Sequence, residues 1–494
     1  MSAALRRSGW MVGAWILSLV VTVQPLRDSD VWWHLAIGHY IVAHGIPAVE
    51  PFSFLHAANP WVGQQWLYEV GLARAVDAGG AGLASLLMGV IASSALLIAV
   101  FSIPRERRPG GPWMACALLL SALVAAQLVG VRGQVISLFG AALVLNIVMR
   151  WRAGSTRVLL FLPPLFAVWA NIHAGFVIGL GIAVIAALAA GNVDGRRRRL
   201  FGAAILAAAV ATLINPAGPA LWGYVATTFS NPTLTGLVIE WQSPDFHNIW
   251  LRIFEVEAFL LVLSWVLSRR RDPFDIVLAG LVFAAALQAQ RNVSLFAIVA
   301  APQLAEYGSA AWSAQRARFP RLRGSRRLRQ PPRWFGAAVV VVVAGGTAAA
   351  VVPQLSASAA LRFEASHEPK AAADFAASHI AGHRLYSTDT WGGYLANRFP
   401  TGRVVYLYDE AAVFGDAALQ QYLDIHTLRP DWSAVITDAG IADAILPADA
   451  GEVSALLTIG WAVDCRDTTS GSVVMSAGGG DRNASSLAAA PACV

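Results

Sequence analysis

The chain has 494 residues, of which 56% are hydrophobic and 13% are charged, and its formal net charge is +6. The apolar residues fall in blocks long enough to cross a bilayer, which excludes an ordinary soluble protein and indicates a polytopic membrane protein. The positive charge is carried by arginine, since Lys370 is the only lysine. These arginines cluster in short links between apolar blocks rather than on a folded surface, which excludes nucleic acid as a partner.

The arginine clusters predict the topology, because short cytoplasmic loops are enriched in Lys and Arg. Arg6 and Arg7 place the N-terminus in the cytoplasm, so the first span delivers Asp28 to the outer face. About eleven spans put every arginine cluster on the cytoplasmic side. The predicted spans lie near residues 9–25, 81–103, 112–130 and 134–149, then two short spans within 157–191, 200–214, an eighth ending at Arg269, a ninth ending at Gln290, a tenth leading into 314–333, and 334–352.

The composition divides the chain into three predicted parts. Residues 1–353 form the transmembrane domain, with a long first outer loop at 26–80 that carries one interfacial helix within residues 28–45 and a second near residues 64–76. Residues 354–476 form a small extracytoplasmic α/β domain, and residues 477–494 are predicted to be disordered. In the α/β domain, the expected strands are 384–387, 403–408, 433–437, 461–465 and 472–475, and the expected helices are 369–379, 417–428 and 452–459. Cys465 and Cys493 lie outside, where a disulfide is permitted but not required.

Two carboxylates, Asp28 and Asp30, follow directly on the first span, and His34 lies one turn further on. Either the carboxylates cap a short interfacial helix, or they hold a divalent cation or supply a general base. Asp30 is better placed to cap the helix, because a cap side chain reaches the backbone N–H two or three residues on. Asp28 is then the expected base.

The remaining specific polar residues also fall on the predicted outer face, and one outward cavity would collect them. They are Gln64, Gln65, Glu69, Arg132, Gln134, Asn171, His173, Glu240, Gln242, Asp245, Arg291 and Asn292. Each has a structural alternative. Arg132 could extend to lipid headgroups, Asn171 and His173 could satisfy backbone groups at the tip of a broken hairpin, and Glu240 could lie in a hydrated loop. Arg291 breaks the arginine rule, which indicates an anionic partner.

The whole pattern resembles the GT-C superfamily of membrane glycosyltransferases. The resemblance is carried by the Asp-x-Asp motif after the first span, the long first outer loop, roughly a dozen spans and the outer α/β domain. Asp-x-Asp-x-Trp-Trp-His-Leu, His-Gly-Ile-Pro, Asp389-x-Trp391-Gly-Gly-Tyr394 and Trp169-x-Asn171-x-His173 are similar to motifs of a mostly uncharacterised group of bacterial inner-membrane proteins of GT-C type.

The resemblance implies transfer of a sugar from a polyprenyl-phosphate-linked donor to a lipid, glycan or protein acceptor on the outer face. It implies a multi-pass protein of the bacterial inner (plasma) membrane. Carried over to this chain, Asp28 or Asp30 is the base, and Arg132 or Arg291 binds the phosphate. His34 and His173 assist, and the other expected substrate-binding residues are Asn171, Glu240, Gln242 and Glu69. Metal use is left open, with Asp28 and Asp30 as the ligands if a cation such as Mg²⁺ or Mn²⁺ takes part.

The alternative is a non-enzymatic membrane protein, either a transporter or a scaffold for lipid-linked substrates. A transporter is expected to carry charges near the bilayer midplane or repeated broken helices. The polar residues of this chain gather instead at one end of the spans, which favours the transferase.

Overall fold

The computed structural model describes residues 3–55, 60–191, 193–230, 239–319, 333–379, 382–478 and 490–493, and these form two compact units. The helical unit comprises Met1–Pro25 and Leu83–Leu355, and the mixed unit comprises Leu26–Gly82 and Ser356–Val494. The sequence placed the first outer loop with the spans, whereas in the structure residues 26–82 pack with the C-terminal part.

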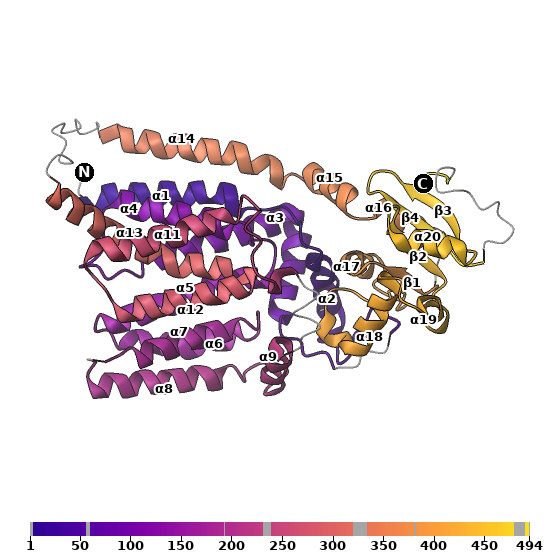
Figure 1. Cartoon of the computed structure of the whole chain (residues 1–494), viewed down its shortest axis with the longest axis horizontal. Helices are drawn as coiled ribbons and strands as arrows, with labels where there is room; N and C mark the ends of the chain where they lie inside the picture. The colour runs from indigo at the N-terminus through magenta and orange to yellow at the C-terminus, as the bar shows by residue number, and fades with distance from the viewer. Residues whose placement is uncertain are drawn as a thin grey trace. The chain divides into compact units, whose positions relative to one another are not determined.

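A helix lies at each of the eleven segments predicted as spans. Figure 1 shows these helices running alongside one another. The elements up to η5 are α1 (Ala3–Thr22), α2 (Asp30–His44), α3 (Trp66–Val100), α4 (Gly111–Ala125), α5 (Gly133–Arg152), η1 (Arg157–Phe161), α6 (Leu162–Trp169), α7 (Phe176–Leu188), α8 (Gly195–Ala211), α9 (Ala220–Ser230), η2 (Ile239–Trp241), α11 (Arg252–Ser268), α12 (Pro273–Gln288), η3 (Gln290–Asn292), α13 (Val293–Arg318), α14 (Arg333–Val351) and η5 (Val352–Leu355). Helix α3 is broken at Gly79 and Gly80, where the predicted outer loop ends.

Within the described residues, two helices are long and apolar enough to cross a bilayer, α3 and α5. A third span results if the broken helix pair 341–355 and 357–367 is counted as one. Shorter apolar helices lie at Gly9–Thr22, Gly111–Ala125, Arg157–Trp169, Phe176–Leu188 and Pro273–Gln288. The chain is therefore a mainly helical protein with membrane-spanning segments, and the count of eleven spans stays a prediction.

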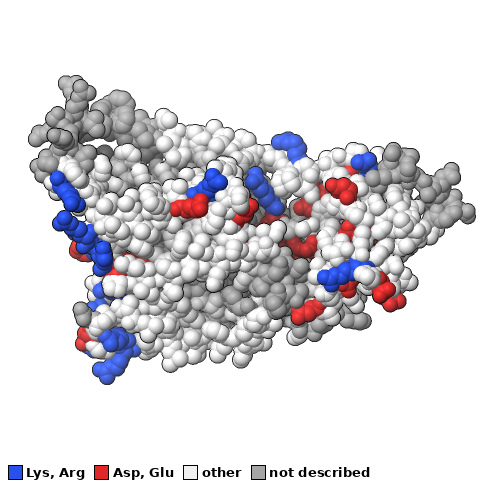
Figure 2. Space-filling view, viewed as in Figure 1, with Lys and Arg blue, Asp and Glu red and all other residues white. Residues whose placement is uncertain are grey.

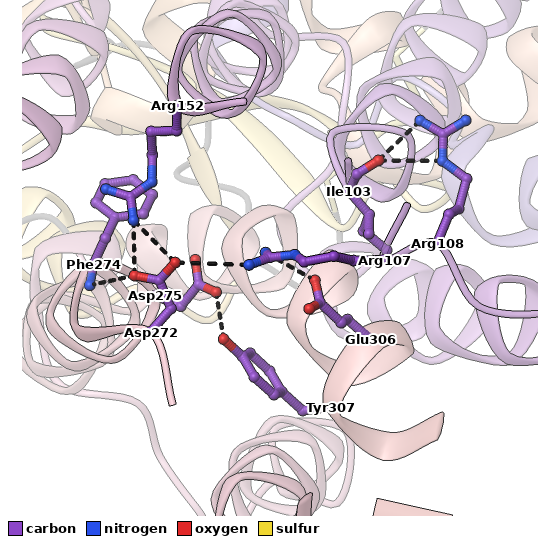
Figure 3. A network of polar contacts seen from close by, with 9 residues as sticks. All are labelled: Ile103, Arg107, Arg108, Arg152, Asp272, Phe274, Asp275, Glu306 and Tyr307. Carbon is purple, nitrogen blue, oxygen red and sulfur yellow. Dashed lines mark hydrogen bonds and ion pairs between the residues drawn. The ribbon is translucent and has the colours of Figure 1, made fainter. Parts of the chain in front are cut away.

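The core of the helical unit is α13, which packs against α4, α5, α11 and α12. Its residues from Val293 to Gly308 are almost all buried, as expected for a helix that is apolar on every face. At the C-terminal end of α5, Arg152 donates two hydrogen bonds to Asp272, and Arg107 lies between Asp272 and Glu306 (Figure 3). These ion pairs join the link before α4 to α5, α12 and α13.

The arginine-rich links therefore gather at one end of the helical unit. Figure 2 shows one group of Lys and Arg side chains at the left edge of this face, with others elsewhere on it. The exposed arginines of these links are Arg105, Arg150, Arg196, Arg198, Arg199, Arg269, Arg270, Arg271, Arg316 and Arg318. This grouping is the one that the topology predicts, while the orientation in a membrane stays a prediction.

The mixed unit is built on a four-stranded sheet with strand order β1-β2-β4-β3. Strands β1 and β2 are parallel, and the pairs β2/β4 and β4/β3 are antiparallel. Its elements after η5 are α15 (Ala357–His367), α16 (Lys370–His379), β1 (Leu385–Ser387), α17 (Asp389–Arg398), α18 (Ala411–His426), α19 (Trp432–Asp438), β2 (Asp443–Pro447), α20 (Gly451–Thr458), β3 (Ala462–Asp467) and β4 (Ser472–Ser476).

The first outer loop extends this sheet. Val405 bridges in parallel to Leu385 of β1 on one side and to Ser53 of the loop on the other. Buried Glu50 fixes the loop here, because its carboxylate accepts hydrogen bonds from the backbone N–H groups of Phe52 and Ser53 at 2.6 Å and from the Tyr408 hydroxyl at 2.9 Å. Burial nevertheless raises the pKa of Glu50.

One strand predicted for this unit is a helix instead. Residues 433–437, predicted as a strand, lie in helix α19, and the neighbour of β1 is instead the buried strand β2. The motif Asp389-x-Trp391-Gly-Gly-Tyr394 forms the first part of helix α17. A short run of β-branched residues does not by itself distinguish a strand from a buried helical turn.

The chain end also differs from the prediction of a tail disordered from 477 to 494. Residues 479–489 lie outside the described residues, but Ala492 bridges in parallel to Arg466 of β3, and Cys493 forms a disulfide with Cys465. The pairing that the sequence only permitted is therefore present, and it fastens residues 490–493 to the sheet.

Candidate functional site

Four aspartates gather in the mixed unit and form what we call the acid centre: Asp28, Asp30, Asp389 and Asp409. Asp28 and Asp30 stand at the start of α2. The Asp28 carboxylate accepts a hydrogen bond from the backbone N–H of Asp30 at 3.2 Å, and the Asp30 carboxylate accepts one from the Trp33 indole at 3.3 Å. The two acids are therefore oriented by their own helix.

The capping role predicted for Asp30 needs a correction, while the base role predicted for Asp28 stays a prediction. The N-cap of α2 is Ser29, no side chain caps the helix, and Asp30 is its first residue. Asp30 is not a cap, because its carboxylate bonds the indole rather than a backbone N–H two or three residues on. The side chain that bonds a nearby backbone N–H is that of Asp28.

Asp389 enters the acid centre from the C-terminal part of the chain. It is the first residue of α17, where a carboxylate is favoured by the helix dipole. The Tyr422 hydroxyl of α18 donates to its carboxylate at 2.9 Å and accepts from its backbone N–H at 3.1 Å. Tyr422 therefore fixes both the start of α17 and the position of the Asp389 carboxylate.

Two glycines bring α17 close to its neighbours. A Cβ at Gly392 would lie 2.1 Å from the Leu407 carbonyl oxygen, and one at Gly393 would lie 3.3 Å from the Ser29 oxygen and the Trp33 nitrogen. Helix α17 therefore packs against α2 on one side and against the extended segment 404–408 on the other, where a larger side chain has no room. Asp409 directly follows that segment.

The electrostatic effect of the acid centre is seen in the pKa of Asp409. Burial raises its pKa well above the usual range, and the negative charges of Asp30, Asp389 and Asp28 raise it further, in that order. A hydrogen bond with Ser29 opposes these effects. Asp409 consequently keeps its proton under conditions in which an isolated aspartate has lost it.

The acid centre can provide both a base and a group that retains its proton. When carboxylates crowd together and one retains a proton, another remains available to accept one. Among the described residues, no three His, Cys, Asp or Glu side chains are arranged to hold a metal ion. The acid centre therefore does not present a cation ligand set, and we derive no step through a cation.

His34, predicted as a catalytic helper, lies in a buried pair. Its Nδ1 is 3.2 Å from the Glu69 carboxylate, and both residues are at most 4% exposed. Gly38 allows this close approach of α2 and α3, because a Cβ there would lie 2.2 Å from the Glu69 carbonyl oxygen. The structure thus brings His34 and Glu69 together in a helix interface, where they join the two helices of the first loop.

A second group of acids lies behind α2. The Trp32 indole donates to buried Glu368 at 2.8 Å, and the Tyr394 hydroxyl donates to Glu364 at 2.8 Å. The Trp32 and Tyr394 rings meet edge to face at 5.1 Å. Burial raises the pKa of Glu368 to about 7, and the charge of Glu364 adds to this effect.

This shift predicts how stability depends on pH. Between about pH 4.5 and 7, the folded chain binds the Glu368 proton more tightly than the unfolded chain, so stability falls as pH rises through this window and levels off above it. A shift of this size corresponds to about 3 kcal/mol. Thermal unfolding of Glu368→Gln is expected to depend less on pH than that of the wild type. An unchanged pH profile would contradict this prediction.

The helical unit holds the predicted phosphate-binding residues. Arg132, just before α5, forms an ion pair with Glu240 of η2, and both side chains are about four-fifths buried. The Arg291 guanidinium lies over the Trp241 ring, 4.4 Å from its centroid. The sequence analysis predicted that Arg132, Glu240 and Arg291 belong to one site. In the structure, Arg132 contacts Glu240, and Arg291 contacts Trp241, the next residue of η2.

The backbone around η2 connects these residues to α5 and α12. Gln134 of α5 donates to the Arg291 carbonyl oxygen at 3.1 Å. Gln242, expected to bind substrate through its side chain, accepts from the Gln290 backbone N–H at 2.9 Å through its own carbonyl oxygen. The starts of α5 and α13 and the end of α12 therefore meet at η2.

Asn171 and His173 make the contacts expected of the structural alternative. Asn171 donates to the carbonyl oxygens of Ala167 and Ile214. His173 Nδ1 lies 2.8 Å from the Ser137 hydroxyl and accepts from the Gly175 N–H at 2.9 Å. Because Nδ1 accepts, the proton of the neutral ring is assigned to Nε2. Both side chains stabilise the tip between α6 and α7.

A small cavity of the helical unit lies away from these residues, near the C-terminal end of α5. It is lined by Ser102, Ile103, Leu145, Met149, Asp275, Val299, Pro302, Gln303 and Glu306. It has room for about one water molecule. Asp275 accepts from the Tyr307 hydroxyl at 2.6 Å (Figure 3), and we assign the cavity to the ion-pair network that joins the helix ends.

Asp409 is the acid-centre residue that the sequence did not single out. A signal was present, because Asp409 and Glu410 directly follow a segment predicted as a strand, where functional side chains often stand. Asp389 was recognised only as part of a motif. The acid centre belongs to the mixed unit and the arginines to the helical unit, so their convergence on one cavity stays a prediction.

The fold is similar to that of an oligosaccharyltransferase from Archaeoglobus fulgidus. The apo crystal structure of that enzyme matches with a TM-score of 0.53 and 13% identity, over 90% of this chain and 70% of that chain. The structure tethered by a disulfide to an acceptor peptide with an NVT sequon gives a TM-score of 0.53 and 13% identity, over 90% and 69%. At this level of identity the likeness shows a shared fold, and the chain therefore has the fold of that oligosaccharyltransferase.

An arabinofuranosyltransferase, AftD, from Mycobacteria matches with a TM-score of 0.46 and 11% identity, over 97% of this chain and 40% of that chain. This likeness is weaker than the likeness to the oligosaccharyltransferase. No protein-family model matches the sequence, and no curated protein matches it.

Proposed function

We propose that the chain is a membrane glycosyltransferase, which transfers a sugar from a polyprenyl-phosphate-linked donor to a lipid, glycan or protein acceptor on the outer face of the bacterial inner membrane. The observation that carries the proposal is the acid centre, in which the first-loop acids Asp28 and Asp30 meet Asp389 and Asp409. The fold shared with an oligosaccharyltransferase supports the class of reaction. Asp28 and Asp30 also belong to a long loop segment, where functional groups often stand.

In the proposed reaction, a carboxylate of the acid centre accepts the proton of the attacking acceptor group. Asp30 is our choice, because it is the first residue of α2 and the Trp33 indole orients its carboxylate. As the new bond forms at the anomeric carbon, the bond to the phosphate oxygen breaks, and the leaving phosphate takes the electron pair. In the helical unit, Arg132 and Arg291 remain the residues predicted to bind phosphate, because a guanidinium matches phosphate geometry and stabilises a developing charge.

A carrier of lipid-linked substrates is the second candidate. Buried Glu257 of α11 is the kind of intramembrane acid that carriers use. Its carboxylate, however, accepts from the Ser121 hydroxyl at 2.5 Å in the interface between α4 and α11. We therefore assign Glu257 to helix packing and favour the transferase.

Native mass spectrometry of the purified protein tests the donor assignment. We expect co-bound polyprenyl phosphate on the wild type and its loss from the double variant Arg132→Gln/Arg291→Gln, because the two cations that bind the phosphate are gone. The matched control is Arg252→Gln, which removes an exposed cation that donates to the Phe246 carbonyl oxygen. Equal lipid content in all three proteins would refute the phosphate-binding role of the arginines.

A further inference from the structure

One short turn contacts both of the arginines expected to bind phosphate. Glu240 of η2 forms the ion pair with Arg132, and its neighbour Trp241 lies under the Arg291 guanidinium. Two consecutive residues of η2 therefore contact Arg132 and Arg291, which are far apart in the sequence. A carboxylate pairs with one, and an aromatic face binds the other.

Gln290 holds η2 in this position through the backbone. Its side-chain amide donates to the Ile239 carbonyl oxygen at 2.9 Å, and its own N–H donates to the Gln242 carbonyl oxygen at 2.9 Å. These two hydrogen bonds join Gln290 to the first residue of η2 and to the residue that follows its last one. Arg291 directly follows Gln290. The position of η2 is therefore coupled directly to the position of Arg291.

We propose that η2 is an exchangeable plug: Glu240 occupies the place of the donor phosphate on Arg132 until the donor arrives, and the phosphate then displaces it. This inference rests on the proposed function, and it adds a regulatory residue to the same site. The expected ligand is the phosphate headgroup of an isoprenoid lipid, since the site must accept an anion in place of a carboxylate.

The electrostatic reason lies in the partial burial of the pair. Arg132 and Glu240 are 19% and 21% exposed in their side chains, so both have lost much of their hydration. A partly desolvated arginine without a counter-ion is costly, which makes a resident carboxylate favourable in the absence of ligand. Phosphate offers more charge and three acceptor oxygens, so it can replace the carboxylate without leaving the arginine unpaired.

The test measures binding of farnesyl phosphate to the purified full chain in detergent, with farnesol and inorganic phosphate as separate probes. Glu240→Gln removes the competing charge and should bind farnesyl phosphate about three- to tenfold more tightly than the wild type, the range expected for losing one partly buried ion pair. Glu240→Asp keeps the charge and should bind about as the wild type does.

Asp245→Asn is the matched control, because Asp245 lies in the same outer loop but its carboxylate bonds exposed His247. This variant should leave binding unchanged, which separates release of Arg132 from a general loss of negative charge. Combining Glu240→Gln with Arg132→Gln should cancel the gain, since the effect acts through that arginine. A gain for inorganic phosphate equal to that for farnesyl phosphate would identify a free-anion site and overturn the lipid assignment.

The outcomes separate this inference from the proposed function. If Glu240→Gln binds farnesyl phosphate as weakly as the wild type or more weakly, while Arg132→Gln abolishes binding, Glu240 positions the arginine and the plug is rejected. If Arg132→Gln and Arg291→Gln both leave binding unchanged, the proposed phosphate site itself fails. Thermal unfolding of each variant shows whether it is folded.

Discussion

Replacing Asp30 by Asn is expected to reduce sugar transfer by a factor of about 10²–10⁴, the range for losing a general base. Asn keeps the volume of the side chain and an oxygen that can accept the Trp33 indole hydrogen bond, so the start of α2 should remain in place. What is lost is the ability to take up a proton. Initial rates of polyprenyl phosphate release by the purified variant, at several acceptor concentrations, measure this effect.

Asp28→Asn is expected to be milder, within about tenfold of the wild type, because an amide oxygen can still accept the backbone N–H of Asp30. The matched control is Asp438→Asn at the exposed end of α19, which should transfer as the wild type does. If Asp28→Asn loses activity and Asp30→Asn keeps it, the base is Asp28. If neither loses activity, the acid centre is structural and the enzymatic proposal loses its main support.

Gly392→Ala is expected to destabilise the mixed unit by about 1–3 kcal/mol or more, as overpacking does. Its new methyl group would lie 2.1 Å from the Leu407 carbonyl oxygen and 3.0 Å from the Tyr408 Cα, so backbone rather than a flexible side chain must move. Because Asp409 follows this segment, activity should fall together with stability. Thermal unfolding and limited proteolysis measure the change.

Gly71→Ala provides the control for this substitution. Gly71 lies in the part of α3 that belongs to the mixed unit, and a Cβ there would meet nothing within 4 Å. Alanine should therefore stabilise the helix by up to about 1 kcal/mol. If the Gly392 and Gly71 variants unfold alike, the close packing of α17 against segment 404–408 is not what holds the acid centre together.

The helical part of the fold could be predicted from sequence because apolar blocks and arginine links are strong local signals. A helix is present at every predicted span, and the break of α3 at Gly80 falls at the predicted end of the outer loop. The partnership of residues 26–82 with the C-terminal part could not be predicted, since it depends on contacts across more than 300 positions, such as the bridge of Ser53 to Val405.

The site was predictable to the extent that each residue carries its own local signal. The carboxylates after the first span and the arginine at an unexpected end of a span could both be recognised from their positions. Asp409 could not, because its importance comes from three other acids that are brought to it by the packing of α17. His34 and Glu69 were recognised as unusual, but only the structure shows that they bond each other inside a helix interface.

Transfer by the purified protein tests the central claim most directly. The donor source is a lipid extract from cells that lack this chain, in which the lipid-linked sugar is not consumed. Mass spectrometry of the lipids should show polyprenyl phosphate forming as its glycosylated precursor disappears, with wild-type protein and not with Asp30→Asn. Equal consumption with wild type, Asp30→Asn and no protein would contradict the assignment of this chain as a glycosyltransferase.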